Sequence, residues 1–471
     1  MTELRDPRLA AQSMAQVSYW LETCGEDLVA RSRLAGDRVV DVAILGGGFS
    51  GLWTAYHLLR ARPDLEVAIV EREVCGYGAS GRNGGWCSPR FPLEPAALIS
   101  RFGIDGARAI LKSVEAAAAY VGEICEREGI DAHYRTTGVL SLARSPKQAA
   151  SLSNTLATFA RLGMDGPLRL LSAGEAFERV HATNIHAGLS TSIGAAVHPG
   201  RLARGLARVV ERLGGTIYEG TAATELRTGA DAAIVTAAGD LSARLAVVAA
   251  GEAYLTGLPR FHRSLLPMSS MIVLTEPLSE SLWSELGWQG GECLSSLAHT
   301  KNYLTRTADG RILYGSRGAN YRFGSRMDDA AIRDETVFEW MRGCVREWWP
   351  ALEGVRFTHA WGGYLGIPRD WMPTVTFDRQ SRLAQLHGYT GRGVATSSLF
   401  GKLLGGLITD QCTGLEKLPF HRSEGKRWEP EPFRWLGVRY VQNAFSRIDE
   451  ADAAGRAPPF DASIAAALGD P

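Results

Sequence analysis

Three features that would assign a protein to a class are missing from this sequence: a long apolar run, an excess of charge of one sign, and paired cysteines. No segment approaches the roughly 20 apolar residues that a membrane-spanning helix needs. The first forty residues lack the basic and then apolar pattern of a secretion signal. We therefore expect a cytoplasmic protein without stable insertion into a membrane.

The charges of the chain cancel, because 51 basic residues face 51 acidic ones. Such a balance offers no basic field that would attract nucleic acid. We therefore expect no nucleic-acid partner, and we expect small molecules as the partners of this protein. At 471 residues the chain is long enough for two domains with a substantial core.

The cysteines are odd in number, include no C-x-x-C pair and have no clustered histidines beside them. This pattern argues against a disulfide framework and predicts no metal site. We expect most of them to be buried as small apolar groups, while two flank a glycine-rich loop. The seven are Cys24, Cys75, Cys87, Cys125, Cys293, Cys344 and Cys412, with Cys75 and Cys87 at the loop.

A glycine cluster interrupts the apolar pattern near the start of the chain. The apolar run 39–45 is typical of a buried parallel strand, and apolar residues recur at helical spacing over 52–59. Between them, Gly46, Gly48 and Gly51 fill the G-x-G-x-x-G frame. Such a turn lets the backbone approach a pyrophosphate and points the N–H groups of the following helix at the phosphates.

The next apolar strand, 65–70, ends at Glu71, twenty positions after Gly51. A carboxylate at that position accepts hydrogen bonds from ribose hydroxyls and repels a 2′-phosphate. The pattern therefore predicts a bound dinucleotide and disfavours NADP. It leaves NAD and FAD open.

Residues 75–86 contain five glycines in twelve positions and cannot form a regular helix or strand. One interpretation is a flexible surface loop. The aromatic residues Tyr77 and Trp86, together with a length beyond that of a simple connection, favour a loop whose backbone lines a ligand.

In the remainder of the chain the predicted secondary structure changes from alternating helices and strands to consecutive strands, and then to helices. Amphipathic helices are expected at 110–124, 152–162 and 202–213, with strands at 138–143, 216–218 and 245–250. From 259 to about 325 strands follow one another, including a hairpin that turns at Asp309-Gly310. A helix follows near 332–348, and Gly391-Arg392-Gly393-Val394 then opens a helix whose N-terminus is offered to an anion.

Five of these features, in this order, resemble the flavin-dependent amine oxidoreductase family typified by D-amino acid oxidase, glycine oxidase and sarcosine oxidase. The likeness is greatest to its γ-glutamylputrescine oxidase branch and runs from about residue 38 to 425. The features are the 46–51 turn, Glu71, the octet G-A-S-G-R-N-G-G at 78–85, Ala249-Ala250-Gly251 and the 391–394 turn. The octet is the most specific of them.

The resemblance implies an α/β fold: a Rossmann-type FAD-binding domain with an inserted, mainly antiparallel β-sheet substrate domain of the α+β class. It places the FAD-binding domain at 1–95, 188–258 and 355–425 and the substrate-binding domain at 96–187 and 259–354. Residues 426–471 would form a C-terminal helical extension.

The resemblance also implies FAD in an extended pose, with Glu71 on the adenosine ribose, Ala223 near the adenine and residues 393–395 aimed at the flavin N1 and C2 carbonyl. A helix N-terminus there stabilises the negative charge of the reduced flavin. The implied cofactor-binding residues are Gly46, Gly48, Phe49, Ser50, Gly51, Glu71, Arg72, Gly78, Ala79, Ser80, Arg82, Asn83, Gly84, Gly85, Trp86, Ala223, Ala250, Gly251, Gly363, Gly391, Gly393, Val394, Ala395 and Thr396.

The sequence departs from members of the family in two places. Members like sarcosine oxidase attach the flavin to a cysteine on the strand that here reads Trp361-Gly362-Gly363-Tyr364, so we expect noncovalent FAD. They also place an oxygen-activating lysine near the position of Leu313. Lys301 or Arg82 could supply that charge instead, so oxidase and dehydrogenase behaviour both stay open.

Candidate catalytic residues are Trp361, Tyr364 and His262. An aromatic wall holds an amine by apolar contact and cation–π attraction, although both aromatic residues also suit ordinary core packing. His262 could act as a base or orient the amine, but a lone histidine is more often structural. Arg317 and Arg322 could clamp a carboxylate or phosphonate, and exposed arginines at strand ends are the common alternative.

The predicted function is FAD-dependent oxidation of the C–N bond of a small primary or secondary amine: an amino acid, a polyamine conjugate or an aminophosphonate. Hydride passes to flavin N5, the imine is hydrolysed, and oxygen or another acceptor reoxidises the flavin. The alternatives are an FAD-dependent hydroxylase and a non-catalytic flavoprotein. The apolar tail from 430 onward suits packing or a dimer surface, so a monomer and a homodimer are both open.

Overall fold

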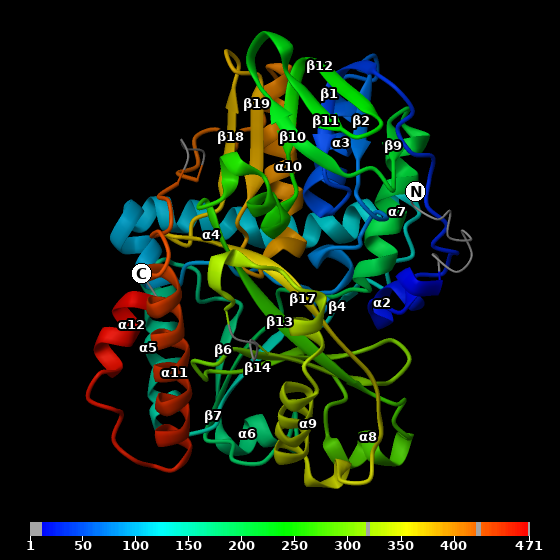
Figure 1. Ribbon diagram of the computed structural model, residues 1–471. Helices are drawn as coiled ribbons and strands as arrows, with labels where there is room; N and C mark the ends of the chain where they lie inside the picture. The colour runs from blue at the N-terminus through cyan, green and yellow to red at the C-terminus, as the bar shows by residue number, and fades with distance from the viewer. Residues whose placement is uncertain (1–11, 317–320, 421–424, 470–471) are drawn as a thin grey trace.

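The computed structural model describes residues 12–316, 321–420 and 425–469, which form two halves, each built on one large sheet (Figure 1). The first sheet, with helices around it, lies in the upper part of the view, and the second sheet lies below it. This arrangement confirms the expected fold class, a nucleotide-binding α/β domain joined to a mainly antiparallel sheet domain.

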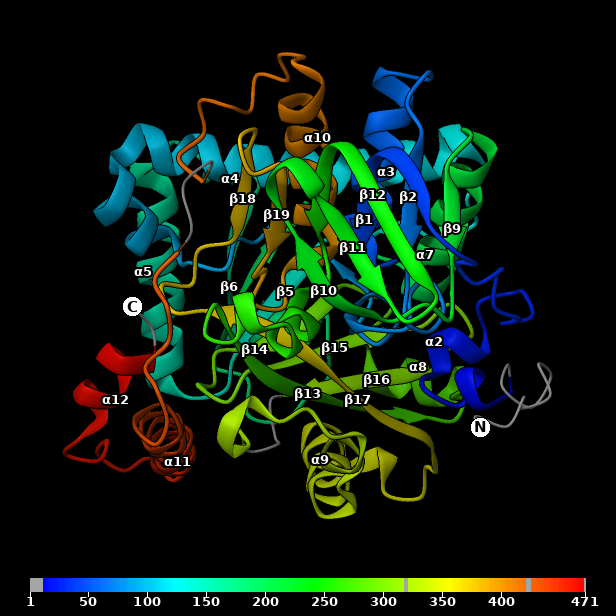
Figure 2. The same ribbon diagram turned by 45° about the horizontal axis from the view of Figure 1, so that its top comes forward.

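The first sheet has eight strands in the order β10-β11-β12-β1-β2-β9, with β19 beside β12 and β18 beside β19 (Figure 2). The neighbours β1–β2, β2–β9, β1–β12 and β12–β19 are parallel, and the other pairs are antiparallel. The bounds are β1 Arg38–Leu45, β2 Val67–Val70, β9 Thr216–Tyr218, β10 Ala223–Arg227, β11 Ala233–Thr236, β12 Gly239–Ala249, β18 Thr374–Asp378 and β19 Leu383–His387.

Four long helices accompany the first sheet: α3 Phe49–Ala61, α4 Pro95–Glu128, α7 Pro199–Arg212 and α10 Gly393–Thr409. Helices α3 and α10 pack closely, because Gly401 brings the α10 backbone against Trp53 and Thr54. Helix α4 is kinked at Gly103, and its buried face joins the same hydrophobic core as α3 and α10. The predicted helices 110–124 and 202–213 lie within α4 and α7.

The second sheet has the order β17-β13-β16-β15-β14-β5-β7-β6, and only its β14–β5 pair is parallel. Its strands are β5 Val139–Ala143, β6 Leu168–Ser172, β7 Ala187–Thr191, β13 Leu265–Thr275, β14 Cys293–Ser296, β15 Asn302–Arg306, β16 Ile312–Ser316 and β17 Phe357–Pro368. The hairpin predicted at Asp309-Gly310 is confirmed, since it joins β15 to β16. A small third sheet pairs β8 Ala195–Ala196 with β3 Trp86–Cys87 and β4 Arg135–Thr136.

Short helices and one amphipathic helix complete the two halves. Helix α9 packs Phe338, Met341 and Val345 against Met271 and Val273 of the second sheet. The remaining α-helices are α2 Tyr19–Glu22, α5 Pro146–Arg161, α6 Ala173–Phe177, α8 Glu280–Leu286 and α9 Glu335–Trp348. The 3-10 turns are η1 Ala79–Gly81, η2 Gly229–Asp231, η3 Glu252–Gly257, η4 Pro259–Phe261, η5 Phe323–Ser325, η6 Asp329–Arg333 and η7 Pro350–Leu352.

The boundaries between the two halves differ from the predicted domain boundaries. Strand β7, at 187–191, and strand β17, at 357–368, pair within the second sheet rather than the first. Helix α4, expected in the substrate domain from residue 96, is buried in the core of the first half. A strand belongs to the half whose sheet it hydrogen-bonds with, and α4 belongs to the half whose core its apolar face contacts. Neither partner can be predicted from the local sequence pattern.

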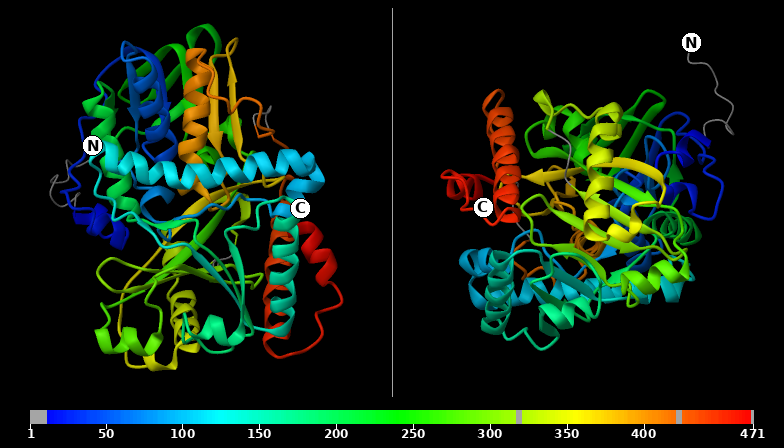
Figure 3. Two further views of the ribbon diagram at one scale, coloured as in Figure 1. Left: turned by 180° about the vertical axis from the view of Figure 1, so that it is seen from behind. Right: turned by 90° about the horizontal axis from the view of Figure 1, so that it is seen from below.

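The C-terminal extension forms two helices, α11 Phe433–Ala453 and α12 Ala462–Gly469, beside the second half (Figures 1 and 3). Asp449 holds α11 to the loop before β15, because its carboxylate accepts the backbone N–H groups of His299 at 2.8 Å and Thr300 at 2.7 Å. Asp452 accepts hydrogen bonds from Ser145 and Gln148 at the start of α5. In the described part of the chain, no helix is both long and apolar enough to span a membrane.

Candidate active site

The glycines at the end of β1 are required by their surroundings. Gly46 has a φ of +106°, and a Cβ there would lie 2.8 Å from the carbonyl oxygen of Ala250. A Cβ on Gly51 would lie only 2.0 Å from the carbonyl oxygen of Gly46. Gly48 then serves as N-cap of α3 without any side-chain cap. The N-terminus of α3 therefore follows directly on the glycine turn, as a dinucleotide-binding turn requires.

Glu71 follows β2 and reaches back to this turn. Its carboxylate accepts the backbone N–H of Gly47 at 2.8 Å and that of Glu73 at 3.0 Å. The N–H of Thr221 donates to the carbonyl of Glu71 at 2.8 Å, which brings the chain leading to Ala223 beside it. Burial raises the pKa of Glu71. A carboxylate has about four acceptor positions, so the Glu71 carboxylate can still accept hydrogen bonds from ribose hydroxyls.

The glycine-rich loop 75–86 is held from several sides. Asn83 donates to the carbonyls of Ala79 at 3.1 Å and Ser80 at 3.0 Å, and its Oδ1 accepts the N–H of Gly85 at 2.9 Å. The indole N–H of Trp20 donates to the carbonyl of Asn83 at 2.7 Å. These bonds argue against a flexible surface loop, and they show that the amide of Asn83 braces the loop.

Arg82 joins the loop to the second sheet. Its Nε donates to the carbonyl of Tyr77 at 2.8 Å, its Nη1 donates to the carbonyl of Gly362 at 3.2 Å, and its guanidinium lies over the ring of Tyr77. Gly363 faces the side chain, because a Cβ there would be 3.2 Å from the Cβ of Arg82. The buried Nη2 has no hydrogen-bond partner in the described residues. It is a donor that a bound group could satisfy.

Two further contacts connect the loop and the late turn to α3. The Oγ of Ser80 accepts the N–H of Phe49 at 2.8 Å, and the hydroxyl groups of Ser50 and Tyr389 lie 2.9 Å apart. Helix α10 begins at Gly393 with no side-chain cap. The starts of α3 and α10 are thus held together, and both present backbone N–H groups.

The other predicted cofactor residues lie on these same segments. The guanidinium of Arg72 lies 5.0 Å from the ring centre of Tyr254, next to which a Cβ on Gly78 would stand. The indole N–H of Trp86 donates to the carbonyl of Leu304 at 3.1 Å. The predicted residues on the turn, the loop, the end of β12 and the start of α10 are Gly46, Gly48, Phe49, Ser50, Gly51, Ser80, Arg82, Ala250, Gly251, Gly391, Gly393, Val394, Ala395 and Thr396. Glu71 joins the turn from the end of β2, and Gly363 joins the loop from β17.

Glu252 is a residue that the sequence analysis missed. It follows Gly251 with a φ of +48°. Its two carboxylate oxygens accept the N–H groups of Gly366 at 3.0 Å and Gly388 at 2.7 Å, which joins the ends of β12, β17 and β19. The pKa of Glu252 is raised to about 7, because burial raises it by more than these N–H donors lower it. Its position three residues after a buried strand was the one signal in the sequence.

Trp361 and Tyr364 are both occupied in structural contacts. The indole N–H of Trp361 donates to the carbonyl of Arg82 at 3.0 Å, and the ring is buried against Trp20 and Leu313. The hydroxyl of Tyr364 donates to the carbonyl of Asp328 and accepts its N–H, each at 2.8 Å. The packing alternative considered for these aromatic residues describes their contacts well.

Tyr303 is a further aromatic residue that contacts the glycine-rich loop, and the sequence analysis did not select it. Its ring lies against Gly84 and Gly315, where added Cβ atoms would come within 2.2 and 2.0 Å of it. Its hydroxyl lies 3.0 Å from that of Ser270, and Thr305 donates to the carbonyl of Gly84 at 2.6 Å. Gly315 stands directly opposite Tyr303 in the hairpin, and this glycine was the available sequence signal.

Two of the other predicted catalytic and substrate residues, His262 and Arg322, have exposed positions in the described part of the chain. His262 is exposed after η4, and its Nδ1 bonds the carbonyl of Thr256 at 2.9 Å. Arg322 is exposed and pairs with Asp328 at 3.6 Å. Arg317 lies outside the described residues. The positions of His262 and Arg322 therefore give no support to their predicted roles.

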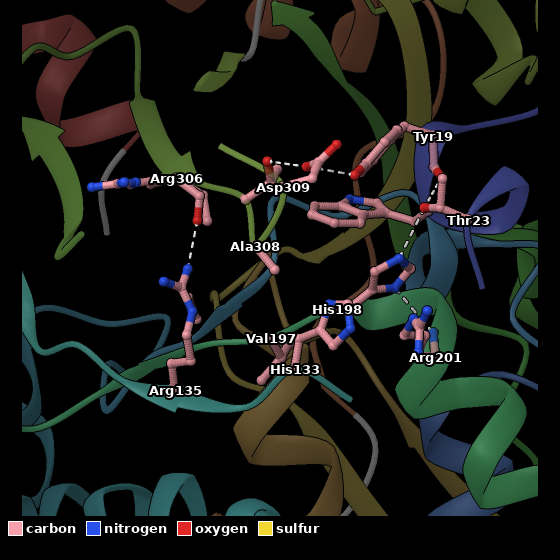
Figure 4. A pocket seen from close by; sticks show the side chains of 14 residues that line it. Tyr19, Thr23, His133, Arg135, Val197, His198, Arg201, Arg306, Ala308 and Asp309 are labelled. Atoms are coloured by element: carbon pink, nitrogen blue, oxygen red, sulfur yellow. Dashed lines mark hydrogen bonds between the residues drawn. The ribbon is translucent and has the colours of Figure 1, made fainter. Parts of the chain in front are cut away.

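A small cavity of about 230 Å³ lies between α2, the start of α7 and the β15–β16 hairpin (Figure 4). His198 caps α7 by accepting the N–H of Arg201 at 3.1 Å, and it bonds Thr23 at 3.0 Å. Tyr19 donates to Asp309 at 2.8 Å. Because burial lowers the pKa of His198 to about 3, the ring is neutral at physiological pH. These polar groups bond one another, so we assign the cavity no cofactor role.

The donor set of the first half fits FAD. The N-termini of α3 and α10 suit the pyrophosphate and the flavin carbonyl, and Glu71 suits a ribose. At α3 the N–H of Phe49 already donates to Ser80, so the pyrophosphate would meet the N–H groups that follow it in the first turn. The glycines at 46, 51, 84 and 363 keep the intervening backbone free of side chains. Among the residues that the structure describes, no group of three or more His, Cys, Asp or Glu could hold a metal ion.

Comparison with known proteins agrees with this assignment. Residues 41–407 match the family model described as "DAO: FAD dependent oxidoreductase". The chain is 30% identical over 406 residues to the γ-glutamylputrescine oxidoreductase of Escherichia coli K12, covering 85% of this chain and 91% of that protein. It is also 30% identical over 393 residues to the probable oxidoreductase OrdL of Rhizobium meliloti, covering 82% and 86%.

Among solved structures, the glycine oxidase of Geobacillus kaustophilus superposes with a TM-score of 0.66 at 22% identity. The likeness covers 82% of this chain and 99% of that one. At this identity the match concerns the fold. It agrees with the pairing of a nucleotide-binding half and a second, mainly antiparallel sheet.

Proposed function

The chain belongs to the DAO family of FAD-dependent oxidoreductases, and on this basis we propose that it oxidises the C–N bond of a small primary or secondary amine. The observation that carries the proposal is the contact between the glycine-rich loop and the second sheet, where Tyr303 lies on Gly84 and Arg82 binds Gly362. That contact places an aromatic ring and two hydroxyls directly beside the cofactor loop.

When bound, FAD supplies the oxidant, because flavin N5 takes hydride from the carbon beside the amine nitrogen and leaves an imine that water hydrolyses to an aldehyde or keto acid. The chain orients the amine for this step. The Tyr303 ring offers a cation–π face, and the hydroxyls of Tyr303 and Ser270 accept N–H hydrogen bonds. The N-terminus of α10 stabilises negative charge at the position that its N–H groups face.

The cofactor is held noncovalently in this proposal. Strand β17 presents glycine at 362 and 363, where sarcosine-oxidase-like members carry the attaching cysteine. Acid precipitation should release all of the flavin into the supernatant. Oxygen or another acceptor reoxidises the enzyme, and the measured rate of that step with oxygen distinguishes an oxidase from a dehydrogenase.

Anaerobic titration of the yellow protein tests the function. We expect loss of the flavin absorbance with at least one member of a panel of amines, amino acids, polyamine conjugates and aminophosphonates. NADPH consumption in the absence of any amine would instead indicate the hydroxylase. A protein that no compound of the panel bleaches would contradict amine oxidation and favour a non-catalytic flavoprotein.

The Tyr303→Phe variant tests the aromatic assignment. It loses the hydroxyl that lies 3.0 Å from Ser270 and keeps the ring on Gly84. We expect the visible spectrum of bound flavin to stay unchanged and kcat/KM for the amine to fall about tenfold, the equivalent of one lost hydrogen bond.

The matched control is Tyr364→Phe, which removes the bonds to Asp328. It should change kcat/KM much less than Tyr303→Phe. A larger loss of kcat/KM in Tyr364→Phe than in Tyr303→Phe would indicate that Tyr364, and not Tyr303, contacts the substrate.

A further inference from the structure

Four consecutive carbonyl groups of the glycine-rich loop, at residues 81–84, each accept a hydrogen bond from a side chain. Residues 82–85 belong to no helix or strand, so these donors hold the loop in place of regular backbone pairing. The donors come from three distant parts of the chain. They are the hydroxyl of Ser18 to Gly81 at 2.6 Å, the indole of Trp361 to Arg82 at 3.0 Å, the indole of Trp20 to Asn83 at 2.7 Å and the hydroxyl of Thr305 to Gly84 at 2.6 Å.

A carbonyl held in this way also fixes the direction of the N–H group that follows it. The peptide unit is planar and trans, so its N–H points opposite to its C=O. The N–H groups of Asn83 and Gly84 belong to the two peptide units whose carbonyls accept from Trp361 and Trp20. Neither N–H has a hydrogen-bond partner among the described residues, so both are donors that a bound group could satisfy.

Two of the four donors lie in one short N-terminal segment, residues 17–24, which contains α2. Trp20 is only 2% exposed and packs in one hydrophobic cluster with Trp361 of the second sheet. Leu21 packs on the loop itself, since a Cβ added to Gly81 would lie 3.1 Å from its side chain. The segment precedes the family match, which begins at residue 41.

We propose that residues 17–24 form an N-terminal clasp that retains FAD, with Ser18 and Trp20 as positioning residues that act through the glycine-rich loop. Trp20 and Trp361 donate to neighbouring carbonyls from one cluster, so the clasp also ties the loop of the first half to the sheet of the second half. The clasp requires bound FAD and does not depend on which substrate the enzyme oxidises.

Release of flavin from the holoenzyme gives the first test. Trp20→Phe removes the indole N–H and leaves the carbonyl of Asn83 without its side-chain donor. We expect FAD to be released about tenfold faster, the equivalent of one lost hydrogen bond. The rise of flavin fluorescence after dilution of the holoenzyme measures the rate. The visible absorption and circular dichroism spectra of the bound flavin should also change.

Trp349→Phe is the matched control for the loss of a buried indole. Trp349 is 1% exposed in the core of the second half, and its indole N–H has no hydrogen-bond partner in the described part of the chain. This variant should melt at a lower temperature but keep the wild-type rate of FAD release and the wild-type flavin spectrum. Equal release rates in Trp20→Phe and Trp349→Phe would overturn the clasp, because they would show an effect of stability alone.

Ser18→Ala is the second variant, and it tests the clasp even if Trp20→Phe does not fold. It removes the hydroxyl bound to Gly81 and also the N-cap of α2. Ser279→Ala controls for the cap, because Ser279 caps α8 in the second half. We expect FAD release to be about fivefold faster in Ser18→Ala and unchanged in Ser279→Ala. Equal rates in these two variants would contradict the clasp, whatever the outcome of the amine titration.

Discussion

Gly51→Ala is expected to abolish stable FAD binding. The new Cβ would lie 2.0 Å from the carbonyl oxygen of Gly46, which is backbone and cannot move aside as a side chain can. Either α3 shifts away from the end of β1 or the turn opens, and in both cases the N–H groups at the start of α3 leave the pyrophosphate position. We expect FAD affinity to fall at least about 100-fold, measured by flavin fluorescence during titration of the apoprotein.

Gly343→Ala is the control for this substitution. Gly343 lies in α9 with no atom within 4 Å of an added Cβ and has no positive φ. Alanine there should leave FAD binding unchanged and stabilise the protein by up to about 1 kcal/mol, because alanine favours a helix. A Gly51→Ala protein that binds FAD as tightly as Gly343→Ala would contradict the assigned role of the turn.

Glu219→Gln is expected to cost about 3–5 kcal/mol of unfolding free energy, because it removes the anion from a buried ion-pair group. Glu219 is fully buried and accepts the side chain of Arg204 at 2.8 Å and that of Arg31 at 3.0 Å. It also accepts the backbone N–H of Cys75 at 2.7 Å, at the start of the cofactor loop. We therefore expect flavin to be released at lower urea concentration as well, which parallel fluorescence and circular dichroism melts would show.

The loss of unfolding free energy in Glu219→Gln should become smaller at low pH. Burial raises the pKa of Glu219, but Arg204, the backbone donors and Arg31 together bring it below the usual value. A carboxyl with a lowered pKa contributes stability above its unfolded pKa, and the contribution is lost as the pH falls through the folded pKa. The difference between wild type and Glu219→Gln should be constant from pH 6 to 8 and shrink below about pH 4.

Glu66→Gln separates this effect from the general loss of a charge. Glu66 is 61% exposed and pairs with Arg244 at 2.7 Å at the surface. Exposed pairs contribute about 0–1 kcal/mol, so this variant should remain close to wild type. A Glu219→Gln protein as stable as Glu66→Gln would show that the buried group does not support the loop.

The cofactor half could be predicted from the sequence because each of its signals is local. The turn at Gly46, the acid at Glu71 and the helix start at Gly393 each lie within one strand-turn-helix segment, where spacing alone fixes their relative position. The same holds for the hairpin at Asp309-Gly310, which joins neighbouring strands. These are the features whose interpretation needed no contact between distant residues.

The substrate side was harder to predict because its contacts are distant in the chain. Tyr303 meets Gly84, and Arg82 meets Gly362, across more than 200 residues. Trp361 looked suited to an amine pocket by residue type, but its indole N–H bonds the loop carbonyl of Arg82. Trp20, far from the loop in sequence, is buried against it and donates its indole N–H to the carbonyl of Asn83. Residue type does not tell which partner a buried side chain has.

The pairing of β1 with β12 also sets the order in which the chain can assemble during synthesis. Strand β1 ends at Leu45, while its neighbour β12 ends at Ala249. A ribosome that adds about 5–20 residues per second needs roughly 10–40 s to make the intervening chain. During that interval an apolar strand edge stays open to other chains. We therefore expect the yield of soluble protein to rise when a chaperone that shields strands is co-expressed.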